Sequence, residues 1–126
     1  MVVQEVYYPL FVYGTLRQQG NHHHLLMGSE CLREHYILNG FALYDYQQQY
    51  PFMIRHADHS VIGEVYRVDE PTLEQLHEWE EVAERVYRFV FLPEVQMYTY
   101  VKYDHDPGTM PLVKSGDWIA YVSAVG

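Results

Sequence analysis

Glu80 is the residue of this chain best placed by the sequence for proton transfer. Pro71 to Val82 reads as a helix, because capping residues and a proline stand at its start. At about 100° per residue, Leu73 and Leu76 define an apolar face, and Glu80 falls between them. Burial raises the pKa of a carboxyl group, which suits proton exchange near neutral pH. Three other glutamates of the segment project away from that face: Glu74, Glu78 and Glu81.

A helix that ended before Glu80 would leave this carboxylate in solvent, without a special function. Helix ends read from sequence vary by a few residues, so the spacing leaves both alternatives open. A carboxylate directed at a core is costly unless it is paired or hydrogen-bonded. The surroundings of Glu80 therefore decide between the two.

A glycine turn after an apolar run offers a second candidate site, for an anion. Tyr7 to Val12 predicts a buried strand, and the run ends at Tyr13-Gly14-Thr15-Leu16. Glycine lets the backbone turn sharply and approach a ligand closely. The N–H groups of Gly14, Thr15 and Leu16 would then converge on an anion. The alternative is an ordinary turn, which is the more frequent explanation for one glycine after a strand.

The elements that would position these residues are mostly strands. Four further runs read as strands: residues 31–46 with a turn or bulge at Asn39-Gly40, 61–68, 86–92 and 95–103. The last two predict a hairpin around Pro93-Glu94. Residues 47–59, with Pro51 inside, read as a loop, and residues 22–27 as a short helix capped by Asn21. Five or six strands with one clear helix predict an α+β fold with a curled, barrel-like sheet, as a single domain over residues 1–126.

The run from Val95 to Tyr103 alternates strictly. Val95, Met97, Thr99 and Val101 fall on one face, and Gln96, Tyr98, Tyr100 and Lys102 on the other. One alternative is a core face opposite a solvent face. The other is that the tyrosines line a polar cavity.

The composition narrows the classes of partner. The formal charge of −9 comes from 17 acidic and 8 basic residues without a basic cluster, so nucleic acid and anionic membranes are not expected partners. No apolar run approaches the roughly 18 residues of a membrane span, and the start lacks signal-peptide features. We expect a soluble cytoplasmic protein. The single cysteine, Cys31, allows neither an internal disulfide nor a cysteine metal cluster.

The motifs of this chain, taken in order, resemble those of the γ-glutamylcyclotransferase-like family. Phe11 to Arg17, followed by Gly20-Asn21, is similar to the opening signature of that family. Residues 76–81 resemble its Leu-Asp-x-x-Glu-Gly element, with His77 in place of the frequent aspartate and Glu81 in place of the usual glycine. Looser matches follow the same order along the chain: Gly63–Val68, Tyr87-Arg88, Tyr98–Val101 and Ser115–Trp118.

The resemblance implies a small mixed β-barrel with peripheral helices and a cavity at one end. It also implies that Glu80 is the catalytic glutamate and that residues 13–16 bind the substrate carboxylate. We expect these groups to converge on a single cavity, with Tyr87 and Tyr98, or Tyr100 in its place, as walls. A second carboxylate at Glu81 would alter the pKa of Glu80.

The family reaction, of the acyltransferase or lyase class, releases 5-oxoproline from a γ-glutamyl amine or γ-glutamyl amino acid. The α-amine of the substrate attacks its own γ-carbonyl, with Glu80 as general base and then acid. The expected partner is therefore a small-molecule γ-glutamyl substrate, and no metal or organic cofactor is needed.

Two rival functions remain. A non-catalytic small-molecule-binding protein of the same fold would keep the turn without depending on Glu80, and a plain interaction protein would have no open cavity. His22-His23-His24 suggests a metal site, but neighbouring residues on a helix point about 100° apart and rarely chelate one ion. We expect a surface histidine run and no bound metal.

Overall fold

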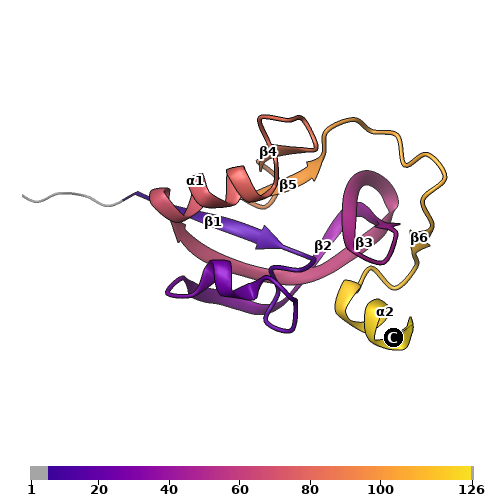
Figure 1. Cartoon of the computed structure of the whole chain (residues 1–126), viewed down its shortest axis with the longest axis horizontal. Coiled ribbons are helices and arrows are strands. Elements are labelled where there is room, and N and C mark those ends of the chain that lie inside the picture. Colours follow the sequence, from indigo (N-terminus) through magenta and orange to yellow (C-terminus); the bar gives the residue numbers. More distant parts are fainter. Residues whose placement is uncertain (1–5, 126) are drawn as a thin grey trace, which may run out of the picture.

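The computed structural model describes residues 6–125, whose strands form one mixed sheet in the order β4-β5-β1-β3-β2-β6 (Figure 1). The strands are β1 Tyr7–Val12, β2 Glu30–Tyr46, β3 Tyr50–Asp69, β4 Tyr87–Leu92, β5 Met97–Lys102 and β6 Leu112–Val113. The helices are α1 Glu70–Trp79 and α2 Trp118–Val125, with a 3-10 turn η1 at His23–Leu26. Neighbouring strands run antiparallel except β1 and β5, which pair in parallel at Leu10 and Tyr98.

The predicted α+β class is confirmed, but the sheet does not close into a barrel. Its edges are β4 and β6, and each of these strands pairs with one neighbour only. β6 contains just two residues, Leu112 and Val113, and it reaches only the hairpin end of β2. The long strands β2 and β3 curl the sheet strongly (Figure 1), so "barrel" describes its curvature and not its connectivity.

The prediction of a loop over residues 47–59 is wrong, because the hairpin of β2 and β3 turns within three residues. Gln47 and Gln48 adopt positive φ angles of 53° and 60°, and Tyr46 then pairs with Tyr50. Pro51 to Ile54 are buried and pair with residues 42–45. The predicted bulge at Gly40 is confirmed by a register shift between Asn39 and Phe41.

Both faces of the sheet are covered, which the sequence did not make clear. One core packs beneath α2, and its members include Phe11, Leu43, Met53, Val61 and Trp118. The second packs beneath α1 and η1, and its members include Leu10, Leu26, Tyr66, Leu73 and Leu76. Met97 and Val101 enter the first core and Tyr100 the second, so the alternation of β5 separates two buried faces rather than core from solvent.

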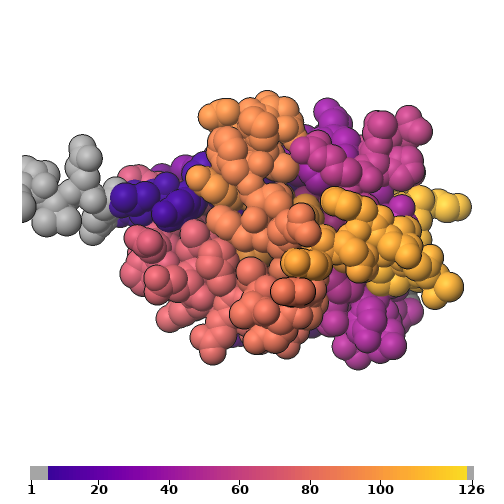
Figure 2. All heavy atoms as spheres, turned by 90° about the horizontal axis from the view of Figure 1, so that it is seen from above, coloured from indigo at the N-terminus to yellow at the C-terminus, as the bar shows by residue number. Residues whose placement is uncertain are grey.

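The chain after β5 lies, in the space-filling view, across the end of the molecule that β2 and β3 form (Figure 2).

Two predictions about helices differ from the structure. The final helix α2 was not predicted, and Asn21 is not a helix cap, because η1 begins after His22 without a side-chain cap. No helix within residues 6–125 has the length and apolar character needed to cross a membrane.

Candidate active site

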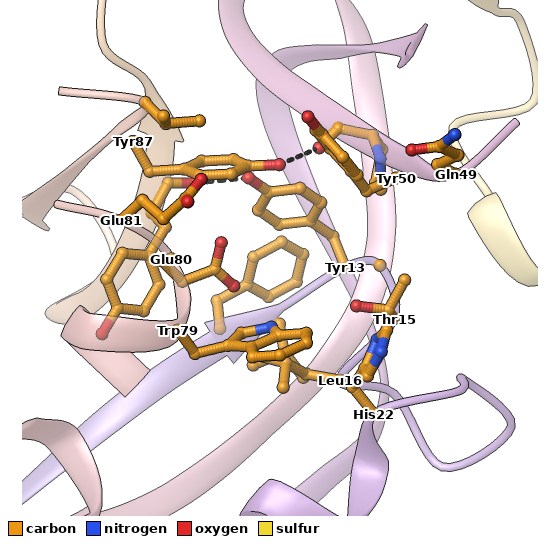
Figure 3. Close-up of a pocket in the computed structure, with 16 residues that line it drawn as sticks. Tyr13, Thr15, Leu16, His22, Gln49, Tyr50, Trp79, Glu80, Glu81 and Tyr87 are labelled. Atoms are coloured by element: carbon orange, nitrogen blue, oxygen red, sulfur yellow. Dashed lines mark hydrogen bonds between the residues drawn. The ribbon is translucent and has the colours of Figure 1, made fainter. Parts of the chain in front are cut away.

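A cavity of about 370 Å³ opens where the end of β1, the end of α1 and the tip of the β2–β3 hairpin meet (Figure 3). The predicted site residues that line it are Tyr13, Gly14, Thr15, Leu16, Glu80 and Tyr87. Phe11, Tyr13, Tyr87 and Tyr100 are buried and form its inner wall. The more exposed residues at its mouth are Gln49, Tyr50, Trp79 and Glu81. Sequence segments as distant as β1 and α1 therefore contribute to one site.

Glu80 lies directly after the last residue of α1 and keeps the helical direction. Its backbone N–H donates to the carbonyl oxygen of Leu76 at 2.8 Å, which is the regular hydrogen bond of an α-helix. The helix ends one residue earlier than Glu80, but this hydrogen bond preserves the angular position that the spacing predicted. The side chain consequently points into the cavity (Figure 3).

Glu81 reverses the chain after the helix. Its φ angle of 53° is left-handed, its N–H donates to Glu78 at 3.1 Å, and the N–H of Val82 donates to His77 at 3.1 Å. This pair of hydrogen bonds is a Schellman motif, whose left-handed position usually holds glycine. The reversal corrects one expectation: Glu81 does not project away with Glu78 but lines the mouth of the cavity.

The carboxyl group of Glu80 has neither a hydrogen-bond partner nor an ion-pair partner among residues 6–125. Burial, with the negative charge of Glu81 adding to it, raises the pKa of Glu80 to about 8. A carboxyl group with this pKa is mostly protonated at pH 7 and ionises just above it, so it can both donate and accept a proton.

The turn after β1 presents unused backbone donors. Arg17 N–H donates to the carbonyl oxygen of Gly14 at 3.1 Å, which closes the turn, and His22 N–H donates to Thr15 at 2.9 Å. Within residues 6–125, the N–H groups of Gly14, Thr15 and Leu16 donate to no other part of the chain. These three donors stand at the wall of the cavity and are free to bind an anion.

Gly14 is required here by a close packing contact. Its φ angle is not in the left-handed region, but a Cβ at this position would lie 2.7 Å from Cγ of Pro51. The carbonyl oxygen of Pro51 accepts a hydrogen bond from the hydroxyl group of Tyr87 at 2.7 Å. The glycine thus lets the tip of the hairpin press against the turn, where Pro51 and Tyr87 complete the wall.

A buried charge cluster supports the turn from behind. Glu64 accepts hydrogen bonds from Nε of Arg17, from the N–H of Gln18 and from the hydroxyl of Tyr66, each at 2.9 Å. Arg17 also reaches Asp117 at 2.9 Å, just before α2. Arg17 and Glu64 stand within motifs of the sequence, but their pairing was not predicted. A glutamate inside an otherwise apolar strand was the one feature that could have indicated a buried partner.

Two tyrosines of the inner wall, Tyr13 and Tyr87, donate their hydroxyl protons to backbone carbonyl groups. The hydroxyl of Tyr13 donates to the carbonyl oxygen of Tyr100 at 2.6 Å, and that of Tyr87 donates to Pro51. Burial, with the charge of Glu80 adding to it, raises the pKa of Tyr13 well above its ordinary value. Both hydroxyl protons are therefore committed to carbonyl groups and are not available to a ligand.

Tyr98 does not line the cavity, and Tyr100 does. Both project from the same face of β5, but Tyr98 lies one strand repeat, about 7 Å, further from the site. It packs instead against Tyr8, Phe89 and Phe91. The alternation identified the correct face, whereas the distance along the strand decided which tyrosine reaches the cavity.

The histidine run is split among different surroundings. The His22 ring lies 4.4 Å from the ring of Trp79 at the cavity wall, and its buried Nδ1 has no hydrogen-bond partner. His23 contacts the carbonyl oxygen of Leu16 through Nδ1 at 2.9 Å. Among residues 6–125 no group of three or more His, Cys, Asp or Glu side chains is arranged to hold a metal ion.

Known proteins of one family resemble this chain over most of its length. The family model described as gamma-glutamyl cyclotransferase, AIG2-like, matches residues 10–120. The "Putative gamma-glutamylcyclotransferase" of Vibrio cholerae is 37% identical over 110 residues, covering 86% of this chain and 93% of that protein. The gamma-glutamylcyclotransferase family protein YtfP of Escherichia coli is 29% identical over 111 residues, covering 87% and 95%.

Solved structures share the fold. An uncharacterized protein of Pyrococcus horikoshii superposes with a TM-score of 0.76 at 26% identity, covering 94% of this chain and 95% of that one. The solution structure of ytfP from Escherichia coli superposes with a TM-score of 0.70 at 27% identity, covering 90% and 97%.

Proposed function

The chain belongs to the gamma-glutamyl cyclotransferase, AIG2-like family of enzymes, and from this premise we propose its reaction. It releases 5-oxoproline from a small-molecule γ-glutamyl amine or γ-glutamyl amino acid by intramolecular aminolysis. Glu80 is the general base and then the general acid, and the turn at residues 13–16 binds the α-carboxylate of the substrate. The observation that carries the proposal is one cavity holding an unpartnered, pKa-raised carboxyl group and three free backbone donors.

The reaction moves two protons from the attacking nitrogen to the leaving nitrogen. Glu80 removes the first proton from the α-ammonium group, and the freed amine attacks the γ-carbonyl carbon to form a tetrahedral intermediate. The bond from this carbon to the leaving nitrogen then breaks as Glu80 gives its proton to that nitrogen, and the ring nitrogen loses its second proton to the ionised Glu80. The products are 5-oxoproline and the amine, which takes up the second proton and departs as an ammonium ion, so Glu80 ends in its starting state.

The pKa of Glu80 suits both transfers. The α-amino group of a peptide has a pKa of about 8, and the free α-carboxylate of a γ-glutamyl substrate raises the pKa of its amine above that. The rise of the Glu80 pKa to about 8 brings this carboxyl group closer to the pKa of the amine than an ordinary glutamate is. A smaller difference in pKa lowers the free-energy cost of the proton transfer.

The turn would act by fixing the reactive conformer. Because the nucleophile is part of the substrate, holding the α-carboxylate in one place brings the amine toward the γ-carbonyl and removes much of the entropic cost of ring closure. Glu64 and Arg17 hold the turn in place from the interior.

Glu80→Gln tests the proposal, because it keeps size and hydrogen bonding but removes proton acceptance. We expect 5-oxoproline release to fall by about 10²–10⁴-fold, while substrate binding survives. The matched control is Glu78→Gln, two residues earlier on the exposed side of α1, which should retain wild-type turnover.

Equal turnover by wild type and Glu80→Gln would remove Glu80 from the mechanism. No release by wild type from any γ-glutamyl amine or dipeptide, with binding retained, would instead favour the non-catalytic binding protein of the same fold. Near Glu80 this chain departs from the family motif at two positions, with His77 in place of aspartate and Glu81 in place of glycine, so that outcome should be tested directly.

A further inference from the structure

The mouth of the cavity carries the negative charge of Glu81 without a compensating cation. No Lys or Arg of the described chain lines the cavity. Arg17, the cation behind the turn, is paired with Glu64 and Asp117. Burial, with His24 adding to it, lowers the pKa of His22, so this ring is neutral at pH 7. A ligand group at the mouth therefore meets the negative charge of Glu81 and no positive charge from the described lining residues.

Aromatic faces flank the acidic residue of the mouth. Trp79 is 44% exposed and lines the cavity two residues before Glu81 in the chain. Tyr50 lies on the hairpin side of the mouth, where burial and then the charges of Tyr46 and Glu81 raise its pKa. Exposed aromatic faces beside a carboxylate attract ammonium groups through cation–π and charge interactions.

Glu81 has no structural partner that would explain its charge. Its side chain makes neither an ion pair nor a hydrogen bond with any described residue. It also holds a left-handed backbone position, which costs a non-glycine residue about 1 kcal/mol or more. A glycine would complete the same Schellman motif with less strain. The side chain is thus free to face whatever occupies the mouth.

We propose that Glu81 is a specificity-determining residue that selects γ-glutamyl conjugates whose leaving amine carries a second positive charge, as a diamine does. This inference rests on the proposed function and narrows its substrate class. With the γ-glutamyl α-carboxylate at residues 13–16 and the reacting atoms at Glu80, the leaving amine extends toward the mouth and Glu81. A leaving group that ends in a carboxylate, as every α-amino acid does, meets like charge there instead.

Three substrates that differ only in the end group of the leaving amine test this inference. They are the γ-glutamyl conjugates of 1,4-diaminobutane, pentylamine and 5-aminopentanoate, whose chains end in an ammonium, a methyl and a carboxylate group. Because an exposed charge pair contributes up to about 1 kcal/mol, we expect kcat/KM for the diaminobutane conjugate to exceed that of the pentylamine conjugate about 3–5-fold. The aminopentanoate conjugate should be the slowest.

For each variant we compare the ratio of kcat/KM between two substrates, so that a change in the overall rate of the variant cancels. Glu81→Gln should reduce the diaminobutane-to-pentylamine ratio to about one, and Glu78→Gln should leave the wild-type ratio unchanged. A wild-type ratio of one, or the same ratio in Glu81→Gln as in wild type, would overturn the inference.

Failure of the proposed function can be told apart from failure of this inference. If wild type releases no 5-oxoproline from any of the three compounds, the proposed function fails. The affinities of the three compounds for wild type are then compared by the change in Trp79 fluorescence on binding. The Trp79→Phe variant shows which part of the signal comes from Trp79. Tighter binding of the diaminobutane conjugate, lost in Glu81→Gln, supports the inference, and equal affinities overturn it.

Discussion

Two glutamates of this protein, the buried Glu64 and the half-buried Glu80, have opposite surroundings. Glu64 lies on β3 behind the turn, 4% exposed, and its carboxylate accepts three hydrogen bonds, one of them from the buried Arg17. Glu80 lies at the end of α1 in the cavity and has no partner among the described residues. A paired carboxylate stabilises a fold, whereas an unpaired one destabilises the charged form and becomes a proton exchanger. The presence or absence of hydrogen-bond and ion-pair partners therefore separates the structural glutamate from the candidate catalytic one.

Removal of the charge of Glu64 should be the most damaging change to stability. Glu64→Gln leaves the buried guanidinium of Arg17 with Asp117 as its one charged partner, besides the carbonyl oxygen of Ile62 at 3.5 Å. Breaking a buried ion pair costs about 3–5 kcal/mol, so we expect a loss near the lower figure in the free energy of unfolding. Urea denaturation followed by circular dichroism measures it. A loss below about 1 kcal/mol would show that the cluster does not hold the turn.

Glu80→Gln should have the opposite effect and stabilise the protein at neutral pH. The folded-state pKa of Glu80 is raised to about 8, above its ordinary value of 4.5. Between these two values the folded state binds more protons than the unfolded state, so the contribution of Glu80 to stability falls as the pH rises. At pH 7 the glutamine variant should gain about 2–3 kcal/mol in the free energy of unfolding.

The same comparison at pH 4 is the internal control. Glu80 is protonated there in the folded state and largely protonated in the unfolded state, so the gain should nearly vanish. A gain of equal size at pH 4 and pH 7 would mean that packing, and not the charge of Glu80, is responsible.

Glu81→Gly should have the smallest effect of the three. The left-handed position after α1 then holds the residue that adopts it with least strain, and we expect about 1 kcal/mol of added stability. Loss of the neighbouring charge should also lower the pKa of Glu80, since Glu81 contributes to its rise. Thermal unfolding and the pH dependence of turnover measure the two effects. Unchanged stability together with an unchanged pH profile would contradict both.

The sequence predicted the groups whose position follows from regular local geometry. Helical periodicity placed Glu80 on the inner face. The hydrogen bond from its N–H to Leu76 shows why this prediction held although the helix ends at Trp79, three residues before the predicted end at Val82. The strand β1, the turn after it and the hairpin of β4 and β5 likewise follow from short-range patterns.

What the sequence missed depends on tertiary contacts. Pro51 and the three glutamines before it suggested a loop, but the strand is stabilised by packing of Pro51 on Gly14 and of residues 52–54 in the core. The position of Glu81 was predicted wrongly because its left-handed backbone redirects its side chain, and helical periodicity assumes a continuous helix. The choice between Tyr98 and Tyr100 required the distance along β5, and the link between Arg17 and Glu64 spans 47 positions of the chain.

The titration of Glu80 itself tests the central claim most directly. Carbon-detected NMR of the side-chain carboxyl carbons, assigned to Glu80 by comparison with the Glu80→Gln spectrum, follows its ionisation from pH 3 to pH 10. An unpaired carboxyl group in this cavity should titrate with a midpoint near 8, shifting downward in Glu81→Gln. A midpoint near 4.5, the ordinary value for glutamate, would show that Glu80 is solvated and would contradict its role as the proton-transfer group.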